Sequence, residues 1–103
     1  MKMNRDMMRQ VQQMQSKLAK AQEEIESKTV EGSAGGGAVT VTITGGFQVQ
    51  TVKIAPDVIE GGDVEMLEDL VVAALSEALQ KAQALQSAHM SSLTAGLRLP
   101  GMP

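Results

Sequence analysis

Side chains that could hold an anionic partner are concentrated at the start of the chain. The first 22 residues contain a single acid, Asp6, and five basic residues, namely Lys2, Arg5, Arg9, Lys17 and Lys20. This segment has a net charge of +4, and because the whole chain carries −3, residues 23–103 must carry −7. A basic segment beside an acidic remainder favours contact with phosphate groups. The same residues are also compatible with an ordinary solvated helix surface.

The residue types needed for catalysis or for a transition-metal site are scarce. His89 is the single histidine, and the chain has no cysteine. These residues cannot form a zinc site or a Ser/His/Asp arrangement within one chain. The glycine-rich stretch at residues 32–37 lacks the Gly-Lys-Ser/Thr ending of a nucleotide-binding loop, so it predicts a tight bend or a close chain approach at a subunit contact. We therefore expect no enzyme activity, no metal and no cofactor.

Acidic and aromatic residues narrow the possible ligands further. Six acids between residues 57 and 69 lack the spacing of a calcium-binding loop and are typical of a solvated helix face. They are Asp57, Glu60, Asp63, Glu65, Glu68 and Asp69. Phe47 is the only aromatic residue, which disfavours stacking on the bases of a single strand.

The basic residues belong to a segment with a strong helical pattern. No glycine or proline occurs from Asn4 to Ser27, and good helix formers dominate. Apolar residues recur with alternating spacings of four and three, the pattern of a helix that packs along a partner helix. They are Met7, Val11, Met14, Leu18, Ala21 and Ile25.

The middle of the chain alternates between apolar and polar residues, as strands do. The spacing predicts strands at residues 29–34, 39–44 and 47–54, the first pairing beside the second, although a sheet continued across a dimer is an alternative. Gly45-Gly46 predicts a two-residue turn with positive φ. The alternation slips within the third strand, which predicts a β-bulge near Gln50-Thr51.

A second long helix should follow, with Asp63 as its N-cap and an end near Ser92. The fold class is therefore α+β, with a long N-terminal helix, a small antiparallel sheet of about three strands and a long C-terminal helix. We expect one domain over residues 1–93 and a flexible Gly/Pro/Met tail over 94–103.

So short a chain, without disulfides, needs another source of stability, and we expect a homodimer. The expected interface residues are Met7, Val11, Met14, Leu18, Leu70, Val71 and Ala74. No stretch approaches the roughly 20 apolar residues that cross a bilayer, and the N-terminus lacks the apolar core of a secretory signal. We expect a soluble cytoplasmic protein.

Three ordered motifs closely resemble the bacterial YbaB/EbfC family. They are residues 30–37 (VEGSAGGG), 52–54 (VKI) and 63–71 (DVEMLEDLV). The resemblance extends over nearly the whole chain, although residues 45–47 depart from the more polar hairpin expected in relatives. It implies a tweezer-like homodimer that binds DNA and associates with the nucleoid, with a possible link to recombination or replication proteins.

Two hypotheses about function follow. The preferred one is a non-enzymatic protein that binds duplex DNA as a homodimer, mainly through phosphate contacts, in nucleoid organisation, gene regulation or DNA repair. The alternative is an adaptor that docks a replication or recombination partner on its apolar helix faces.

Overall fold

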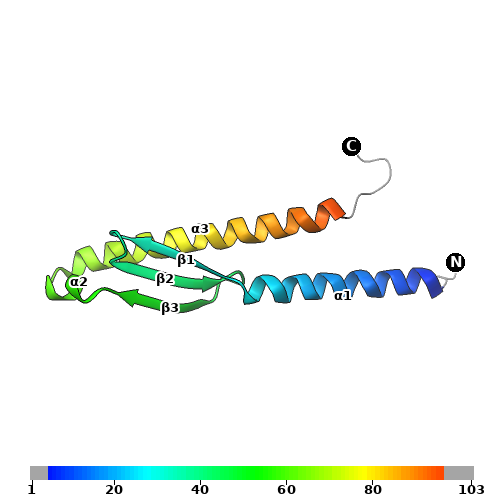
Figure 1. The fold of residues 1–103 in the computed structure, drawn as a ribbon, viewed down its shortest axis with the longest axis horizontal. Coiled ribbons are helices and arrows are strands. Elements are labelled where there is room, and N and C mark those ends of the chain that lie inside the picture. The colour runs from blue at the N-terminus through cyan, green and yellow to red at the C-terminus, as the bar shows by residue number, and fades with distance from the viewer. Residues whose placement is uncertain (1–4, 97–103) are drawn as a thin grey trace.

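A computed structural model describes residues 5–96 of the 103 (Figure 1). The elements follow the order α1 (Arg5–Ser27), β1 (Thr29–Ala34), β2 (Val39–Thr44), β3 (Val49–Ile54), α2 (Pro56–Glu60) and α3 (Val64–Gly96). The three strands form one antiparallel sheet in the order β1-β2-β3. This architecture confirms the α+β class and the three expected strands.

The bulge in β3 lies where the alternation slips. Thr42 pairs with Thr51, but the next residue, Ile43, pairs with Val49, so Gln50 is the extra residue on β3. The bulge brings Val49 to the same face of the sheet as Val52, because both lie opposite buried residues of β2. The predicted bulge is confirmed.

The turn between β2 and β3 differs from our expectation. Positive φ occurs at Phe47 (64°) and not at Gly45 or Gly46, and β3 begins at Val49 and not at Phe47. Gly45 is needed for a different reason, since a Cβ there would overlap the carbonyl oxygen of Ile25. The Thr44 hydroxyl holds the turn by accepting hydrogen bonds from the amides of Gly46 (3.2 Å) and Gln48 (3.1 Å).

The second long helix begins as the sequence indicates. The Asp63 carboxylate accepts a hydrogen bond from the Met66 amide (3.0 Å), which satisfies one of the free N–H groups of the first turn. The helix does not end near Ser92 but continues to Gly96, so the first three residues of the expected tail are helical. The remainder of that tail, residues 97–103, lies outside the described residues.

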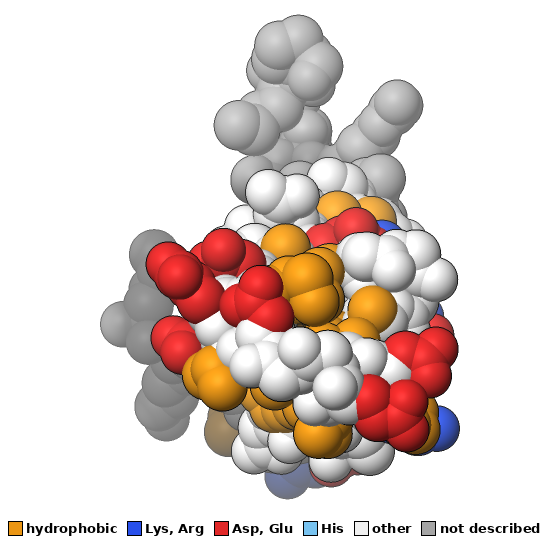
Figure 2. All heavy atoms as spheres, turned by 90° about the vertical axis from the view of Figure 1, so that its left-hand side faces the viewer, with side chains coloured by type: hydrophobic (Ala, Val, Ile, Leu, Met, Phe, Trp, Pro, Cys, Tyr) orange, Lys and Arg blue, Asp and Glu red, His pale blue; other side chains and the backbone are white. Residues whose placement is uncertain are grey.

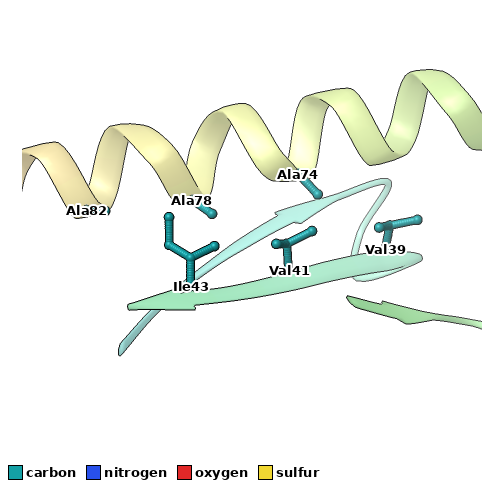
Figure 3. Close-up of a cluster of buried hydrophobic side chains, with 6 residues drawn as sticks. All are labelled: Val39, Val41, Ile43, Ala74, Ala78 and Ala82. Atoms are coloured by element: carbon teal, nitrogen blue, oxygen red, sulfur yellow. The ribbon is translucent and has the colours of Figure 1, made fainter. Parts of the chain in front are cut away.

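The core is a single layer between α3 and the sheet. Val39, Val41 and Ile43 of β2 point toward α3 and are fully buried (Figure 3). The helix covers them with three small residues, Ala74, Ala78 and Ala82, which are fully buried too.

The same close packing requires Gly32 on β1. A Cβ at this position would overlap the Ala74 carbonyl oxygen and the Ala78 amide nitrogen. The packing of α3 on the sheet also corrects our placement of Ala74 at a subunit interface, because this side chain is enclosed by its own chain.

The two edge strands of the sheet, β1 and β3, differ in how much of their edge is covered. On β1, Lys81 Nζ donates to the Glu31 carbonyl oxygen (2.9 Å), and the Ser33 amide donates to the Glu77 carboxylate (3.3 Å). Lys81 and Glu77 also form a salt bridge (3.1 Å). This Glu77–Lys81 clamp closes the β1 edge, whereas every residue of β3 except Ile54 is exposed. An open strand edge is a template for pairing with another strand.

The contact beneath α3 can be tested by a single methyl group. Gly32→Ala should lower the free energy of unfolding by roughly 1–3 kcal/mol, because the helix must move off the sheet. Gly61→Ala is the control, since its Cβ would meet only ordinary contacts at 3.7 Å and beyond and its φ is −67°. Urea unfolding followed by circular dichroism measures both. Equal stability of the two variants would contradict the packing described above.

The clamp gives a prediction about pH. Hydrogen bonds from Lys81 and from the Ser33 amide lower the pKa of Glu77 below its ordinary value of 4.5. Because the pKa of Glu77 is lower in the folded protein than in the unfolded chain, its ionised carboxylate stabilises the fold. This stabilisation is complete above the unfolded-state pKa and is lost as pH falls through the folded-state pKa. Glu77→Ala should therefore melt at a lower temperature than the unmodified protein at pH 7, and this difference should shrink as pH falls below about 4. Lys81→Met should reproduce the effect, and a difference that stays constant between pH 7 and pH 3 would contradict it.

Candidate nucleic-acid interface

Helix α1 projects from the body of the protein as an arm. In Figure 1 it extends beyond the end of the sheet, and the chain measures 71 × 27 × 18 Å. Its 23 residues span about 35 Å, yet only Ala21 and Ile25, near its C-terminal end, are buried. Most of the helix surface is thus available to other molecules.

The basic residues expected from the sequence are gathered on this arm. Arg5, Arg9, Lys17 and Lys20 are all exposed. None of them takes part in a salt bridge within residues 5–96. Lys2, the fifth basic residue of the expected set, lies outside the described residues.

Polar residues complete the surface between these charges. Gln12, Gln13 and Ser16 line a shallow, open face of α1 together with Arg9, Lys17 and Lys20. Arginine and lysine supply positive charge, whereas the amides and the hydroxyl can donate further hydrogen bonds to phosphate oxygens. The face is suited to an extended anion and has no enclosed cavity for a small ligand.

The apolar stripe of the arm lies on the other side of the helix. At 3.6 residues per turn, Val11 and Leu18 point roughly opposite to Arg9 and Lys20. Met7, Val11, Met14 and Leu18 are 45% to 51% exposed in the single chain. Partner helices bury such stripes, and the residues of α1 that its own chain buries, Ala21 and Ile25, lie near its C-terminal end.

The other expected interface residues are placed differently. Leu70 and Val71 are half-buried and pack against the core of their own chain. They have little surface left for a partner. Ala74, as noted above, has none.

A small cavity marks the junction where α1 joins the body. It is lined by Leu18, Ala21, Gln22 and Ile25 of α1 and by Gln86, His89, Met90 and Leu93 of α3. The Gln86 amide donates to the Gly45 carbonyl oxygen and so ties α3 to the hairpin. His89 Nε2 is buried, and it has no hydrogen-bond partner among the described residues.

Neither a metal centre nor a phosphate loop emerges from the described residues. Between Arg5 and Gly96 no three His, Asp or Glu side chains are close enough together to hold a metal ion. Gly35, Gly36 and Gly37 all have positive φ and form the turn from β1 to β2, so they lead into a strand and not into a helix. The expected bend is confirmed. Gly32 makes the close approach, but to α3 of its own chain and not to another subunit.

Two exposed residues on β3 were missed by the sequence reasoning. Val49 and Val52 face the α3 side of the sheet but remain 54% and 48% exposed, because α3 lies over β1 and β2. The alternating pattern identifies the face on which they lie. It does not show that one helix is too narrow to cover three strands.

None of the helices in the described range is long and apolar enough to cross a membrane. The architecture is similar to that of a crystal structure of an uncharacterized protein from Helicobacter pylori. It covers 94% of this chain and all of the other, with a TM-score of 0.69 at 17% sequence identity. This likeness supports the fold alone.

Sequence comparisons identify relatives and a family as well as a fold. Proteins named nucleoid-associated protein are 46% identical in Ruminiclostridium cellulolyticum (94% of this chain, 85% of the relative) and 47% identical in Acetivibrio thermocellus (94% and 87%). A third, from Chloroflexus aurantiacus, is 47% identical and covers 91% of this chain and 94% of its own length. The model of the YbaB/EbfC DNA-binding family matches residues 1–97. The resemblance of the three motifs is thereby confirmed, and this chain belongs to the YbaB/EbfC DNA-binding family.

Proposed function

We propose that this protein binds duplex DNA as a homodimer, mainly through phosphate contacts made by the α1 arms. The observation that carries the proposal is the set of four exposed basic residues on one side of a projecting helix, none of them in a salt bridge within the described range. Family membership makes DNA the ligand to expect for such a surface.

The chemistry of the arm favours phosphates over bases. Phosphate contacts need only charge and hydrogen-bond donors, which Arg9, Lys17 and Gln13 supply. Stacking on bases needs aromatic side chains, and the one aromatic residue, Phe47, lies in the hairpin and not on the arm. We therefore expect little dependence on DNA sequence.

The position of the arm also reduces repulsion from the acidic part of the chain. Electrostatic interactions in physiological salt are screened over about 8 Å, much less than the length of the arm. DNA held along α1 is therefore largely screened from the acids near α2 and at the start of α3.

Dimerisation has two sources of support in the single chain. The apolar stripe of α1 is about half exposed, and the open edge of β3 lies beside exposed Val49 and Val52. We propose that a second copy covers both surfaces. A dimer presents two basic arms, so it doubles the phosphate contacts available to one particle.

The relatives named nucleoid-associated protein favour a place in the bacterial nucleoid, within the cytoplasm. We propose a role in nucleoid organisation, gene regulation or DNA repair, without catalysis. The exposed apolar stripe of α1 is also consistent with the adaptor hypothesis, in which a recombination or replication protein binds to this stripe. Loss of DNA binding on mutation of the arm would favour the first function, and unaltered DNA binding the second.

The dimer can be tested on the uncovered side of β3. Val52→Asp should shift sedimentation equilibrium toward the monomer, since it places a charge on a surface that the partner buries. Thr51→Asp is the matched control, because Thr51 is exposed on the opposite face of the same strand. Leu18→Asp should act in the same direction through the arm. A stable monomer of the unmodified protein at micromolar concentration would refute the homodimer.

The DNA contact can be tested by its dependence on salt. With about four to six phosphates neutralised, log K should fall against log salt with a slope of roughly −4 to −5. Arg9→Gln with Lys17→Gln removes up to four contacts from a dimer, so binding should weaken on every duplex and the slope should flatten. Lys28→Gln with Lys53→Gln makes the same change in net charge away from the arm and should have a smaller effect. Gel-shift titrations on unrelated duplexes measure both, and an unaltered slope in the folded arm variant would place the DNA elsewhere.

A further inference from the structure

The end of the molecule opposite the arm has an unusual surface. Residues 54–80 contain seven acids and no lysine or arginine. Six of them, from Asp57 to Asp69, surround α2 and the first turns of α3, and all six are exposed. Figure 2, which views this end directly, shows red acidic side chains on both sides of orange apolar ones.

Three apolar side chains of this end are more exposed than the large apolar side chains of the arm. Ile59 on α2 is 63% exposed, and Val64 and Val72 on α3 are 66% and 64% exposed. On a helix, residues three, four and seven apart lie on one side, so Val72 is a neighbour of Asp69, Glu68 and Glu65. We call these residues the acidic end: an apolar face with a rim of carboxylates.

A surface of this kind fits a helix that is both basic and apolar, and the chain itself carries one. On the arm, Met8 lies beside the basic side of the helix, one turn from Arg5 and next to Arg9 in the chain. Met8 is 51% exposed, and both arginines are exposed. Apolar side chains and charges of opposite sign are thus available on the two surfaces.

The arm and the acidic end of one chain cannot meet. They lie at opposite ends of a molecule 71 Å long, with the sheet between them (Figure 1). That separation is several times the screening length of about 8 Å. Their complementarity can be satisfied only between molecules.

We propose that the acidic end of one molecule binds the α1 arm of a second copy, so that the protein assembles end to end in the absence of DNA. The contact joins two different surfaces, and such heterologous contacts propagate into chains when they do not close into rings. This assembly is additional to the homodimer, which covers the apolar stripe of α1 and leaves its basic side free.

DNA and the acidic end would compete for the same arginines. Duplex DNA should therefore disperse the assembly, and neutral residues at the acidic end should make DNA binding slightly tighter. This competition rests on the proposed DNA binding, whereas the self-association does not.

The experiment is sedimentation velocity on the full chain without nucleic acid, in about 50 mM and about 500 mM salt. We expect species larger than the dimer at low salt, with association weakened roughly tenfold or more at high salt. Glu65→Gln with Glu68→Gln should abolish the larger species. Glu23→Gln with Glu24→Gln is the control, because it makes the same change in net charge on α1 and should preserve them.

Charge reversal identifies the two surfaces directly. Arg5→Glu with Arg9→Glu and, in a second protein, Glu65→Arg with Glu68→Arg should each fail to assemble alone and should assemble when mixed. Ile59→Ser should weaken assembly without loss of folding, since this side chain is mostly exposed.

Three outcomes would overturn the proposal: no species larger than the dimer at low salt, equal effects of the acidic-end and control variants, or no assembly in the mixture. If no species larger than the dimer forms at low salt, a basic segment of another protein becomes the partner to seek for the acidic end. Gel shifts with the same proteins separate this result from the DNA function, because the glutamine variant at the acidic end should still bind duplex DNA.

Discussion

The close approach of α3 to the sheet is the constraint on which the rest of the structure depends. Gly32 and the three alanines of α3 remove the side-chain volume that normally separates a helix from a sheet. The resulting core is one layer thick, and its largest fully buried side chains are those of Val39, Val41 and Ile43. A core of this kind offers little apolar surface against which other helices or strands can pack.

Because the core is only one layer thick, parts of the sheet and of α1 remain uncovered. One helix covers β1 and β2 but not β3, and α1 reaches the core only through Ala21 and Ile25. The β1 edge of the sheet is closed by the Glu77–Lys81 clamp. Apolar surface is therefore concentrated on β3, on one side of the arm and at the acidic end, each with its own chemical surroundings.

Local patterns in the sequence predicted the two long helices, the strands, the bulge and the Asp63 cap, because each depends on residues close together in the chain. The errors occurred where distant segments decide. Gly45 is small because of Ile25 on another element, and Ala74 is buried because of β2. The basic face of the arm was predictable from spacing alone. The exposure of Val49 and Val52 was not, since it depends on the width of α3 relative to the sheet.

The attachment of α1 at only one end makes the helix a lever. Its fulcrum is the junction at Ala21 and Ile25, beside the cavity that holds His89. A tilt of about 10° there displaces Arg5, about 30 Å from Ile25 along the helix, by roughly 5 Å, about the rise of one helical turn. Arg9, about 24 Å from Ile25, moves by about 4 Å, whereas Lys17 and Lys20 lie near the fulcrum and move by only about 1–2 Å. Small changes in packing at the junction therefore set the position of the outer charges relative to the body of the protein.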